Sequence, residues 1–496
     1  MRNCVGVLFL AAGIAMAQQP LPAPTFRTGT ELVQLSVIAR DKNGLPVADL
    51  RREEFQLFDN GAPREIRVFV PETAKSDPTL NERKAANTFT NQIAAMAASH
   101  SGYSVILIDD LFSGSDPTYE EGSAYTRSRA LQMLRSIPTG ERIAIYAPGR
   151  KLRVICEFTA DRDLLERQLR RWKPTPSTPV PESRPSLPIQ QSPEVTQMLT
   201  RAATEAARID QLQRATAGDL EMDLIADHLA GIPGRKNLIW LANKFPIGPQ
   251  ALQHLNRAGV SIYPVDIDGV CRLCPERPKQ LMDRIAALTG GVAFYSRNDV
   301  DVAIREAMDD GRVSYTLGFY PSGDDGSPSQ GHRLTVKITR PGVDARYRTS
   351  YELKAPLPSS WTAQADLVQA LKQALSSPID ATAIPITATV TRVQDRLNLE
   401  AVLAVDSLDL VPENNQWRGR IEVVARFTTA DGVFPSDAFA QTFTLNLNPS
   451  AYATDERAGY TYHNEFKIPA GAAELKLLFA NPASGKIGTL TIPLSK

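Results

Sequence analysis

A loop rich in oxygen-bearing side chains follows the apolar segment Val105 to Ile108. Carboxylate and hydroxyl oxygens are the ligands that hard cations such as Mg2+ and Ca2+ prefer. The loop is therefore a candidate metal site, although the favoured interpretation is that its first aspartate accepts hydrogen bonds from loop amides. The side chains concerned are Asp109, Asp110, Ser113, Ser115 and Asp116.

A second reactive pattern is the pair Cys271 and Cys274, separated by two residues and followed by Pro275. Two cysteines at this spacing before a helix resemble a redox dithiol. No second cysteine pair or nearby histidine supports zinc binding. A structural disulfide is the favoured interpretation and an exported thiol oxidoreductase the alternative. Cys156 lies in an apolar segment and is predicted to be a buried thiol.

Other catalytic motifs are absent from the sequence. It contains no Gly-x-Ser-x-Gly, phosphate loop or dinucleotide fingerprint, and its five histidines are scattered. The basic turns Gly149-Arg150-Lys151 and Gly234-Arg235-Lys236 are predicted to cap strands and helices rather than to bind phosphate. We therefore expect a protein without enzymatic activity.

Length and charge limit the class of protein. A chain of 496 residues predicts about three domains. Lys and Arg number 55 and Asp and Glu number 55, so the net charge is zero and does not favour nucleic acid as a partner. We expect a protein partner, whose identity the sequence does not reveal.

The first residues predict export. Arg2 precedes an apolar stretch, and Ala15-Met16-Ala17 resembles a signal cleavage site, so residues 1–17 are predicted to be a signal peptide. After cleavage no transmembrane segment is expected. The mature protein is predicted to be secreted or periplasmic.

Strand-type and helix-type patterns alternate along the chain. Residues 25–73 and 313–355 alternate apolar and polar side chains and are predicted to form one discontinuous small β domain. Between them, residues 100–312 alternate strands and helices, which favours an open, mainly parallel sheet with helices on both faces. Residues 74–100 are interpreted as a connector. An extended insertion is predicted over 173–194, where seven prolines fall between Pro174 and Pro193.

The last third of the chain has a different pattern. A helical connector is predicted over 359–378, followed by a β-sandwich over 380–496. The sandwich prediction depends on seven alternating segments separated by turn-forming residues. The expected fold class is thus α/β plus all-β.

Five ordered segments resemble one protein family. They begin at Asp41, Gly140, Leu229, Leu288 and Asp309 and read DKNGLPVADLRREEFQLFDNG, GERIAIYAPGRKLRV, LAGIPGRKNLIWLANKFP, LTGGVAFYSRNDV and DDGRVSYTLGFYP. These segments are similar to secreted bacterial proteins with a domain related to von Willebrand factor A (VWA). The resemblance implies a Rossmann-like open sheet and a binding or adhesion role in the envelope or outside the cell.

The resemblance also implies a metal-ion-dependent adhesion site, but the ligand pattern is degenerate. Asp109 and Ser113 match the first and last positions of the family's Asp-x-Ser-x-Ser motif, whereas Leu111 offers no oxygen at the middle one. Thr216 and Asn243 are the nearest matches to the distant ligands. Lys244 would repel a cation, so binding of Mg2+ or Ca2+ is expected to be weak.

The carboxyl ends of parallel strands meet at one edge of a sheet, where ligands of such folds bind. The loops after Ile108, Ala242 and Val265 should therefore form a common rim. We expect this rim to bind a protein partner, with a structural role in an envelope assembly as the alternative. The predicted rim residues are Asp110, Ser115, Asp116, Lys244, Asp266 and Asp268.

Overall fold

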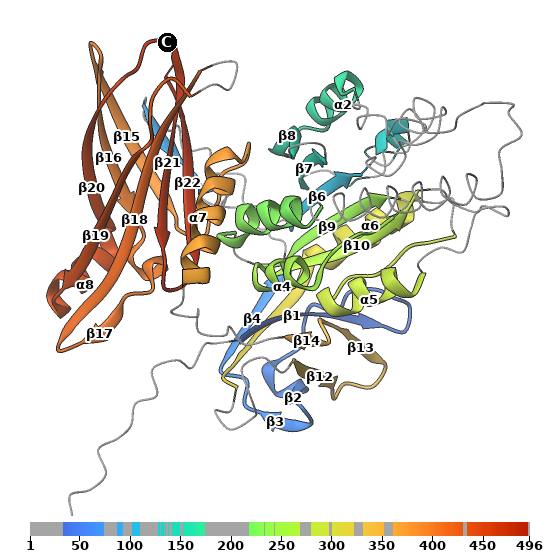
Figure 1. Ribbon diagram of the computed structural model, residues 1–496. Coiled ribbons are helices and arrows are strands. Elements are labelled where there is room, and N and C mark those ends of the chain that lie inside the picture. Colours follow the sequence, from blue (N-terminus) through green and yellow to red (C-terminus); the bar gives the residue numbers. More distant parts are fainter. Residues whose placement is uncertain are drawn as a thin grey trace, which may run out of the picture.

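The structure is a computed structural model that describes most of the chain. The described residues are 33–73, 87–92, 102–109, parts of 127–137, 141–148, 152–173, 218–232, 234–242, 244–267, 279–296, 300–321, 331–351, 361–429 and 434–494. They form an α/β unit (within 102–312), a small β unit (33–73 and 313–351) and a C-terminal β unit (87–92 and 361–494). Figure 1 shows the C-terminal β unit beside the α/β unit and the small β unit below it.

The α/β unit is built on a sheet of five strands. From one edge of the sheet inward, the strands β10, β9, β6 and β7 are parallel to one another. Strand β8 forms the other edge and is antiparallel to β7. Nearly every residue of the parallel strands is buried, which explains their continuous apolar sequences. The strands are β10 (Val260–Asp266), β9 (Lys236–Ala242), β6 (Tyr103–Ile108), β7 (Arg142–Ala147) and β8 (Arg153–Thr159).

Helices cover both faces of this sheet. Leu165, Leu169 and Ile304 pack on one face, and Ile225 and Leu255 pack on the other. Two separate apolar cores result, one on each side of the sheet. The helices are α2 (Arg162–Arg171), a helix at 218–230, α4 (Pro249–Arg257), α5 (Lys279–Thr289) and α6 (Val300–Arg312).

The small β unit contains two four-stranded sheets around one core, to which Leu35, Leu57 and Leu317 contribute. β1 pairs antiparallel with β11, so segments from either side of the α/β unit lie side by side. The first sheet contains β13 (Val343–Arg346), β1 (Val33–Asp41), β11 (Val313–Phe319) and β4 (Val68–Thr73). The second contains β14 (Ser350–Tyr351), β12 (His332–Ile338), β2 (Phe55–Asp59) and β3 (Ala62–Arg64), with the 3-10 helix η1 at Arg52–Glu54.

The C-terminal β unit contains two antiparallel sheets that share one large core, including Leu399, Val423 and Leu477. One sheet has β20 (Tyr460–Lys467), β16 (Arg396–Leu403), β15 (Ile386–Val393) and β5 (Thr88–Thr90). The other has β17 (Val411–Glu413), β18 (Gln416–Thr429), β21 (Ala472–Asn481), β22 (Lys486–Pro493) and β19 (Phe439–Leu447), which pairs with β18. Helices α7 (Trp361–Ser376), α8 (Pro449–Ala458) and η3 (Val405–Leu408) complete the unit.

Strand β5 corrects the interpretation of residues 74–100 as a connector. β5 pairs antiparallel with β15 and so belongs to the C-terminal β unit. Asn91 follows it and is buried, and its Nδ2 donates to the carbonyls of Ala381 (2.8 Å) and Ile384 (3.0 Å). Its Oδ1 accepts from the Ile386 amide at 2.7 Å. These contacts, rather than any local pattern, fix the short strand.

Both β units contact the α/β unit near the amino ends of its parallel strands. From the small β unit, Arg40 donates to Asp310 at the end of α6. From the C-terminal β unit, the Thr382 amide donates to the carbonyl of Asp227 at 3.0 Å, and Thr382 Oγ1 accepts from the Gly231 amide at 2.7 Å. Gly231 lies between the 218–230 helix and β9. The amino end of the sheet is thus where the units join.

Candidate functional site

The carboxyl ends of three neighbouring strands bring two aspartates to one edge. Asp266 ends β10 and lies opposite Ala242, the last residue of β9. Asp109 follows β6, and its amide donates to the carbonyl of Leu241 at 2.9 Å. Since neighbouring strands lie about 4.8 Å apart, the two aspartate backbones are roughly 10 Å apart with Ala242 between them. We call Asp109, Ala242, Lys244 and Asp266 the strand-end rim.

Asp109 is 5% exposed and is held by a residue of the neighbouring strand. Its Oδ2 accepts a hydrogen bond from Trp240 Nε1 at 3.0 Å. Trp240 is fully buried, and a buried indole N–H needs an acceptor. The carboxylate therefore satisfies a core tryptophan at the strand end, a contact that the sequence does not predict.

Asp266 is 4% exposed and is flanked by the segment that follows α5. Its amide donates to the carbonyl of Phe294 at 2.8 Å, and the Ile267 amide donates to the carbonyl of Ala242 at 3.2 Å. Lys244, two residues after β9, is exposed. Among the described rim residues, Lys244 is thus exposed and the two aspartates are largely covered.

The remaining predicted site residues lie outside the described part of the chain. They are Asp110, Ser113, Ser115, Asp116, Thr216, Asn243, Asp268, Cys271 and Cys274. The proline-rich insertion at 174–193 and the signal segment at 1–17 lie outside it too. Of the predicted rim and metal residues, the structure thus places Asp109, Lys244 and Asp266, and it puts them at one edge.

Two of the described rim residues, Asp109 and Asp266, carry carboxylates. The described residues contain no group of three or more His, Cys, Asp or Glu side chains arranged to hold a metal ion. One oxygen of Asp109 already accepts a hydrogen bond from Trp240.

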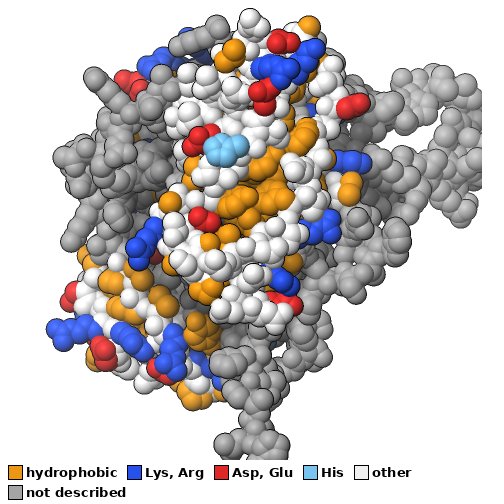
Figure 2. All heavy atoms as spheres, turned by 90° about the vertical axis from the view of Figure 1, so that its left-hand side faces the viewer, with side chains coloured by type: hydrophobic (Ala, Val, Ile, Leu, Met, Phe, Trp, Pro, Cys, Tyr) orange, Lys and Arg blue, Asp and Glu red, His pale blue; other side chains and the backbone are white. Residues whose placement is uncertain are grey.

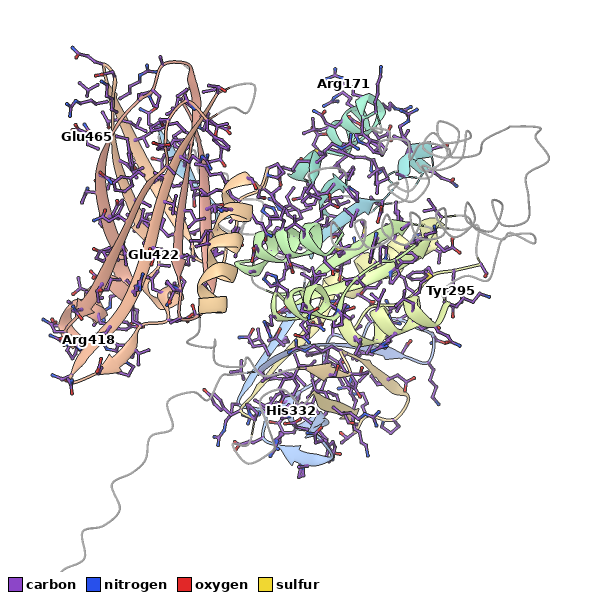
Figure 3. All side chains as sticks on the ribbon, in the orientation of Figure 1. Arg171, Tyr295, His332, Arg418, Glu422 and Glu465 are labelled. Atoms are coloured by element: carbon purple, nitrogen blue, oxygen red, sulfur yellow. The ribbon has the colours of Figure 1, made fainter. Side chains whose placement is uncertain are left out.

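Asp59, His332 and Tyr351 form a buried polar cluster in the small β unit. His332 Nδ1 lies 3.0 Å from Asp59 Oδ1, and the Tyr351 hydroxyl donates to Asp59 Oδ2 at 2.8 Å. An Asp–His pair can orient a general base, but both side chains here are fully enclosed. Figure 3 places His332 inside this unit. The cluster therefore joins three strands of the second sheet, β2, β12 and β14.

The sequence interpretation missed a cavity between the α/β unit and the small β unit. Its lining includes Lys236, which was predicted to lie in a capping turn but is buried. Arg235 beside it is also buried, and its Nη2 donates to the Tyr263 hydroxyl and the Gly290 carbonyl, both at 2.7 Å. No local signal reveals this burial, because residues distant in sequence cover both side chains. Cys156, as predicted, is a buried free thiol.

In the described part of the chain, no helix combines the length and apolar character needed to cross a membrane.

Neither a family model nor a curated protein matches the chain. Solved structures with some likeness include a von Willebrand factor type A protein from Catenulispora acidiphila, 11% identical with a TM-score of 0.28, covering 71% of this chain and 83% of that one. An aerotolerance-related membrane protein from Bacteroides fragilis is 14% identical, with a TM-score of 0.26, over 42% of this chain and 98% of that one. The pilus adhesin SpaC from Lactobacillus rhamnosus GG is 8% identical, with a TM-score of 0.25, over 80% of this chain and 53% of that one. Likeness at this level does not assign a function, so the function has to be inferred from the chain's own residues.

Proposed function

We propose that this chain is an exported, non-enzymatic binding protein whose VWA-like α/β unit presents the strand-end rim to a protein partner. The observation that carries the proposal is the attachment of both β units at the opposite end of the sheet. Arg40 and Thr382 make their contacts near the amino ends of the strands. A partner can therefore bind the carboxyl ends, the usual ligand edge of such sheets, without displacing either unit.

A charge-reversal experiment on the full-length chain tests this role. Lys244 is exposed at the rim, so Lys244→Glu should change a protein contact without disturbing the core. We expect that variant to lose the partner that the parent chain co-purifies from an extracytoplasmic fraction. Lys467→Glu, at an exposed position of β20, is the matched control. Equal recovery with both variants would exclude the rim.

We further propose that the rim binds its partner without a divalent cation. The hydrogen bond from Trp240 to Asp109 and the missing hydroxyl at Leu111 support this. Titration with MgCl2 and CaCl2 in a calorimeter should give no saturable heat. Saturable binding that disappears in Asp109→Asn would contradict the proposal.

A second candidate function, a structural component of an envelope assembly, is favoured by the surface of the C-terminal β unit. Phe439 is 37% exposed on β19. Phe443 on the same strand stacks on Tyr460 and Tyr462 of β20, with ring centroids 5.8 and 5.9 Å apart. Figure 2 shows apolar side chains gathered on this face.

Strand β19 adds a second reason for this alternative. One edge of β19 pairs with β18, and the other edge pairs with no strand among the described residues. Such an edge is a template for pairing with another chain. Under this alternative, Phe439→Asp should abolish higher-order assembly in sedimentation experiments, whereas Lys244→Glu should not. The opposite pattern would favour the rim.

A further inference from the structure

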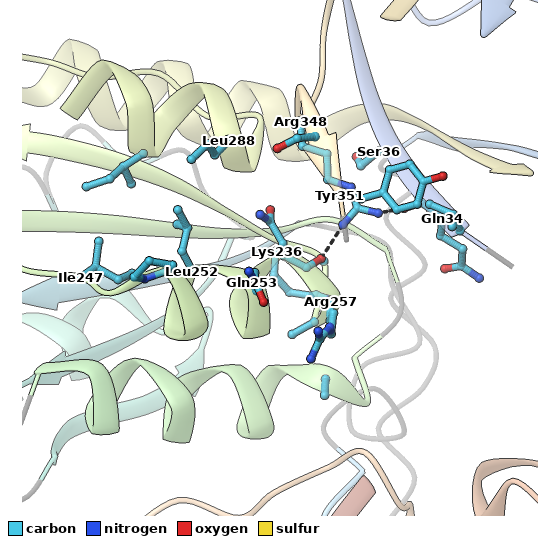
Figure 4. A pocket seen from close by; sticks show the side chains of 18 of the residues that line it. Gln34, Ser36, Lys236, Ile247, Leu252, Gln253, Arg257, Leu288, Arg348 and Tyr351 are labelled. Atoms are coloured by element: carbon cyan, nitrogen blue, oxygen red, sulfur yellow. Dashed lines mark hydrogen bonds between the residues drawn. The ribbon is translucent and has the colours of Figure 1, made fainter. Parts of the chain in front are cut away.

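A cavity of about 630 Å3 lies where the α/β unit meets the small β unit. This volume falls in the range of about 300 to 1,000 Å3 that is usual for small-molecule sites. Its walls come from the start of β9, from α4 and α5, and from β1 and residues 348–351 of the small β unit. Figure 4 shows Lys236 and Arg348 toward one end of the cavity and Ile247 and Leu252 toward the other.

The charged side chains that line the cavity are all cations. They are Lys236, Arg257, Arg284 and Arg348, and the lining, all of it described, contains no aspartate or glutamate. Arg257 and Arg284 are exposed at its mouth, whereas Lys236 is 4% exposed. An uncompensated set of cations around an enclosed space creates a positive potential that attracts an anion.

Lys236 is incompletely satisfied. Its Nζ donates to the carbonyl of Ile232 at 2.7 Å, and this is its one hydrogen bond to the described residues. An ammonium has three donors and a full charge, and a carbonyl does not neutralise that charge. Burial lowers the pKa of Lys236 to about 8. The side chain therefore has both donors and charge available for an anion.

Arg348 is held in place by two backbone carbonyls. Nη1 donates to Asn256 at 2.9 Å, and Nη2 donates to Gln34 at 2.7 Å. Its Nε is buried and has no hydrogen-bond partner in the described part of the chain. Buried donors of this kind are rare unless something else binds them. The guanidinium is thus fixed in position, with its charge uncompensated and one N–H unused.

The carboxylate that acts electrostatically on Lys236 belongs to Glu72 of β4, which is engaged elsewhere. Its Oε1 accepts from Thr316 Oγ1 at 2.6 Å, and its Oε2 accepts from Ser314 Oγ at 3.2 Å. Glu72 acts on Lys236 only at longer range, since no ion pair within 4.0 Å joins them among the described residues. It does not line the cavity.

The wall away from the cations is apolar. Ile247 and Leu252 contribute from α4 and the turn before it, and Leu281, Ile285 and Leu288 contribute from α5. Burying an aliphatic chain against such a wall stabilises a complex, because it removes apolar surface from water. The cavity therefore combines a cationic end with an aliphatic surface.

We propose that this cavity binds an amphipathic anion, with a carboxylate or phosphate head between Lys236 and Arg348 and an aliphatic body against α4 and α5. The cationic end of the cavity lies at the amino ends of the strands, where Lys236 begins β9, whereas the strand-end rim lies at their carboxyl ends. Binding here is therefore independent of the function proposed for the rim, and failure of one does not bear on the other.

Calorimetric titration of the full-length chain with four ten-carbon probes, each below its micelle concentration, tests the ligand class. Decanoate and decyl phosphate carry the two candidate heads, decanol is neutral, and decyltrimethylammonium is cationic. We expect saturable binding of at least one anion, with decanol at least tenfold weaker and the cation inactive. The tighter anion identifies the head group. Equal binding of decanol and both anions, or no binding of either anion, would overturn the proposal.

Variants locate the site. Lys236→Met should weaken anion binding at least tenfold without lowering the melting temperature, because it removes a buried and uncompensated charge. Arg284→Gln, at an exposed lining position, cannot disturb the core and should weaken binding about two- to threefold. Arg333→Gln, an exposed position of β12 outside the cavity, should change nothing. Anion affinity unchanged in both lining variants would refute the assignment.

Discussion

Asp310 is the buried anion that joins the small β unit to the α/β unit. Its Oδ1 accepts from Arg40 Nε at 3.0 Å and from Nη2 at 2.5 Å. Its Oδ2 accepts from Arg346 Nη1 at 2.7 Å and from the Tyr263 hydroxyl at 2.8 Å. Asp310 is fully buried, and the arginine side chains are 14% and 28% exposed. One carboxylate thus satisfies donors from β1, β13 and β10.

Substituting Asp310→Asn keeps the shape but removes the charge. Both arginines would then be left largely buried without a counterion, and breaking a buried ion pair in this way costs about 3 to 5 kcal/mol. The amide oxygen of asparagine can still accept hydrogen bonds, so we expect a loss of about 3 kcal/mol for Asn and about 5 kcal/mol for Ala. At about 2 to 4 °C per kcal/mol for units of this size, Asn should lower the melting temperature by about 6 to 12 °C.

Differential scanning calorimetry of the full-length chain measures this shift. Asp344→Asn is the matched control, because Asp344 is an exposed carboxylate on the same strand as Arg346. Its effect should stay within about 0.5 kcal/mol. The double variant Asp310→Asn with Arg346→Met should recover part of the loss, since one stranded charge is removed. Equal shifts for Asp310→Asn and Asp344→Asn would refute the reasoning.

Three further predictions concern other contacts. Burial lowers the pKa of His254, but hydrogen bonds to two aspartates of the 218–230 helix outweigh burial and raise it to about 10. Protonated His254 should stabilise the folded state by about 1 to 2 kcal/mol, a value reduced to allow for the solvent exposure of its side chain. This contribution should be fully present below about pH 6.5. The contribution should disappear as pH rises through 10. Denaturant unfolding of the chain and of His254→Asn measures it, and a difference in unfolding free energy that does not change with pH would contradict the prediction. Gly231→Ala should destabilise by about 1 to 3 kcal/mol, because a Cβ there would lie 1.9 Å from the carbonyl oxygen of Thr382. Gly331→Ala, with open space around it, is the control, and similar melting temperatures for the two would disprove the clash. Asn91→Ala should lower the free energy of unfolding by about 2 to 4 kcal/mol, because it leaves buried backbone groups unpaired. Asn398→Ala, at an exposed position, is the control and should change it by almost nothing in the same calorimetric experiment.

Local patterns predicted the elements whose stability is local or whose burial is continuous. The alternation from Val33 to Ala39 predicts a strand, and β1 covers Val33–Asp41. Asn60 and Gly61 have positive φ angles of 50° and 84° in the turn between β2 and β3, as an Asn-Gly hairpin requires. Because parallel strands run in the same direction, their carboxyl ends lie on the same side of the sheet. The placement of Asp109 and Asp266 at that side could therefore also be predicted.

Elements that depend on distant partners were missed. β5 has three residues and no usable pattern, and it forms because β15 pairs with it. The burial of Lys236 and Arg348 depends on how two units pack, which no local window reveals. Helix α8 is different, because Asn448 followed by Pro449 is a local pattern typical of a helix start. That pattern could have been used to predict the helix. The Asn448 side chain accepts from the Ala451 amide at 2.8 Å, as an N-cap does.

The pairing of β5 with β15 has a consequence for the order of folding. Thr90 and Ile386 are joined by a hydrogen bond although they lie 296 residues apart. At translation rates of about 5 to 20 residues per second, β5 is complete roughly 15 to 60 s before its partner is synthesised. A fragment beginning at residue 380 would lack an edge strand and the Asn91 hydrogen bonds. The whole α/β unit is therefore a loop between two neighbouring strands, whose ends can pair only after the entire loop has been synthesised.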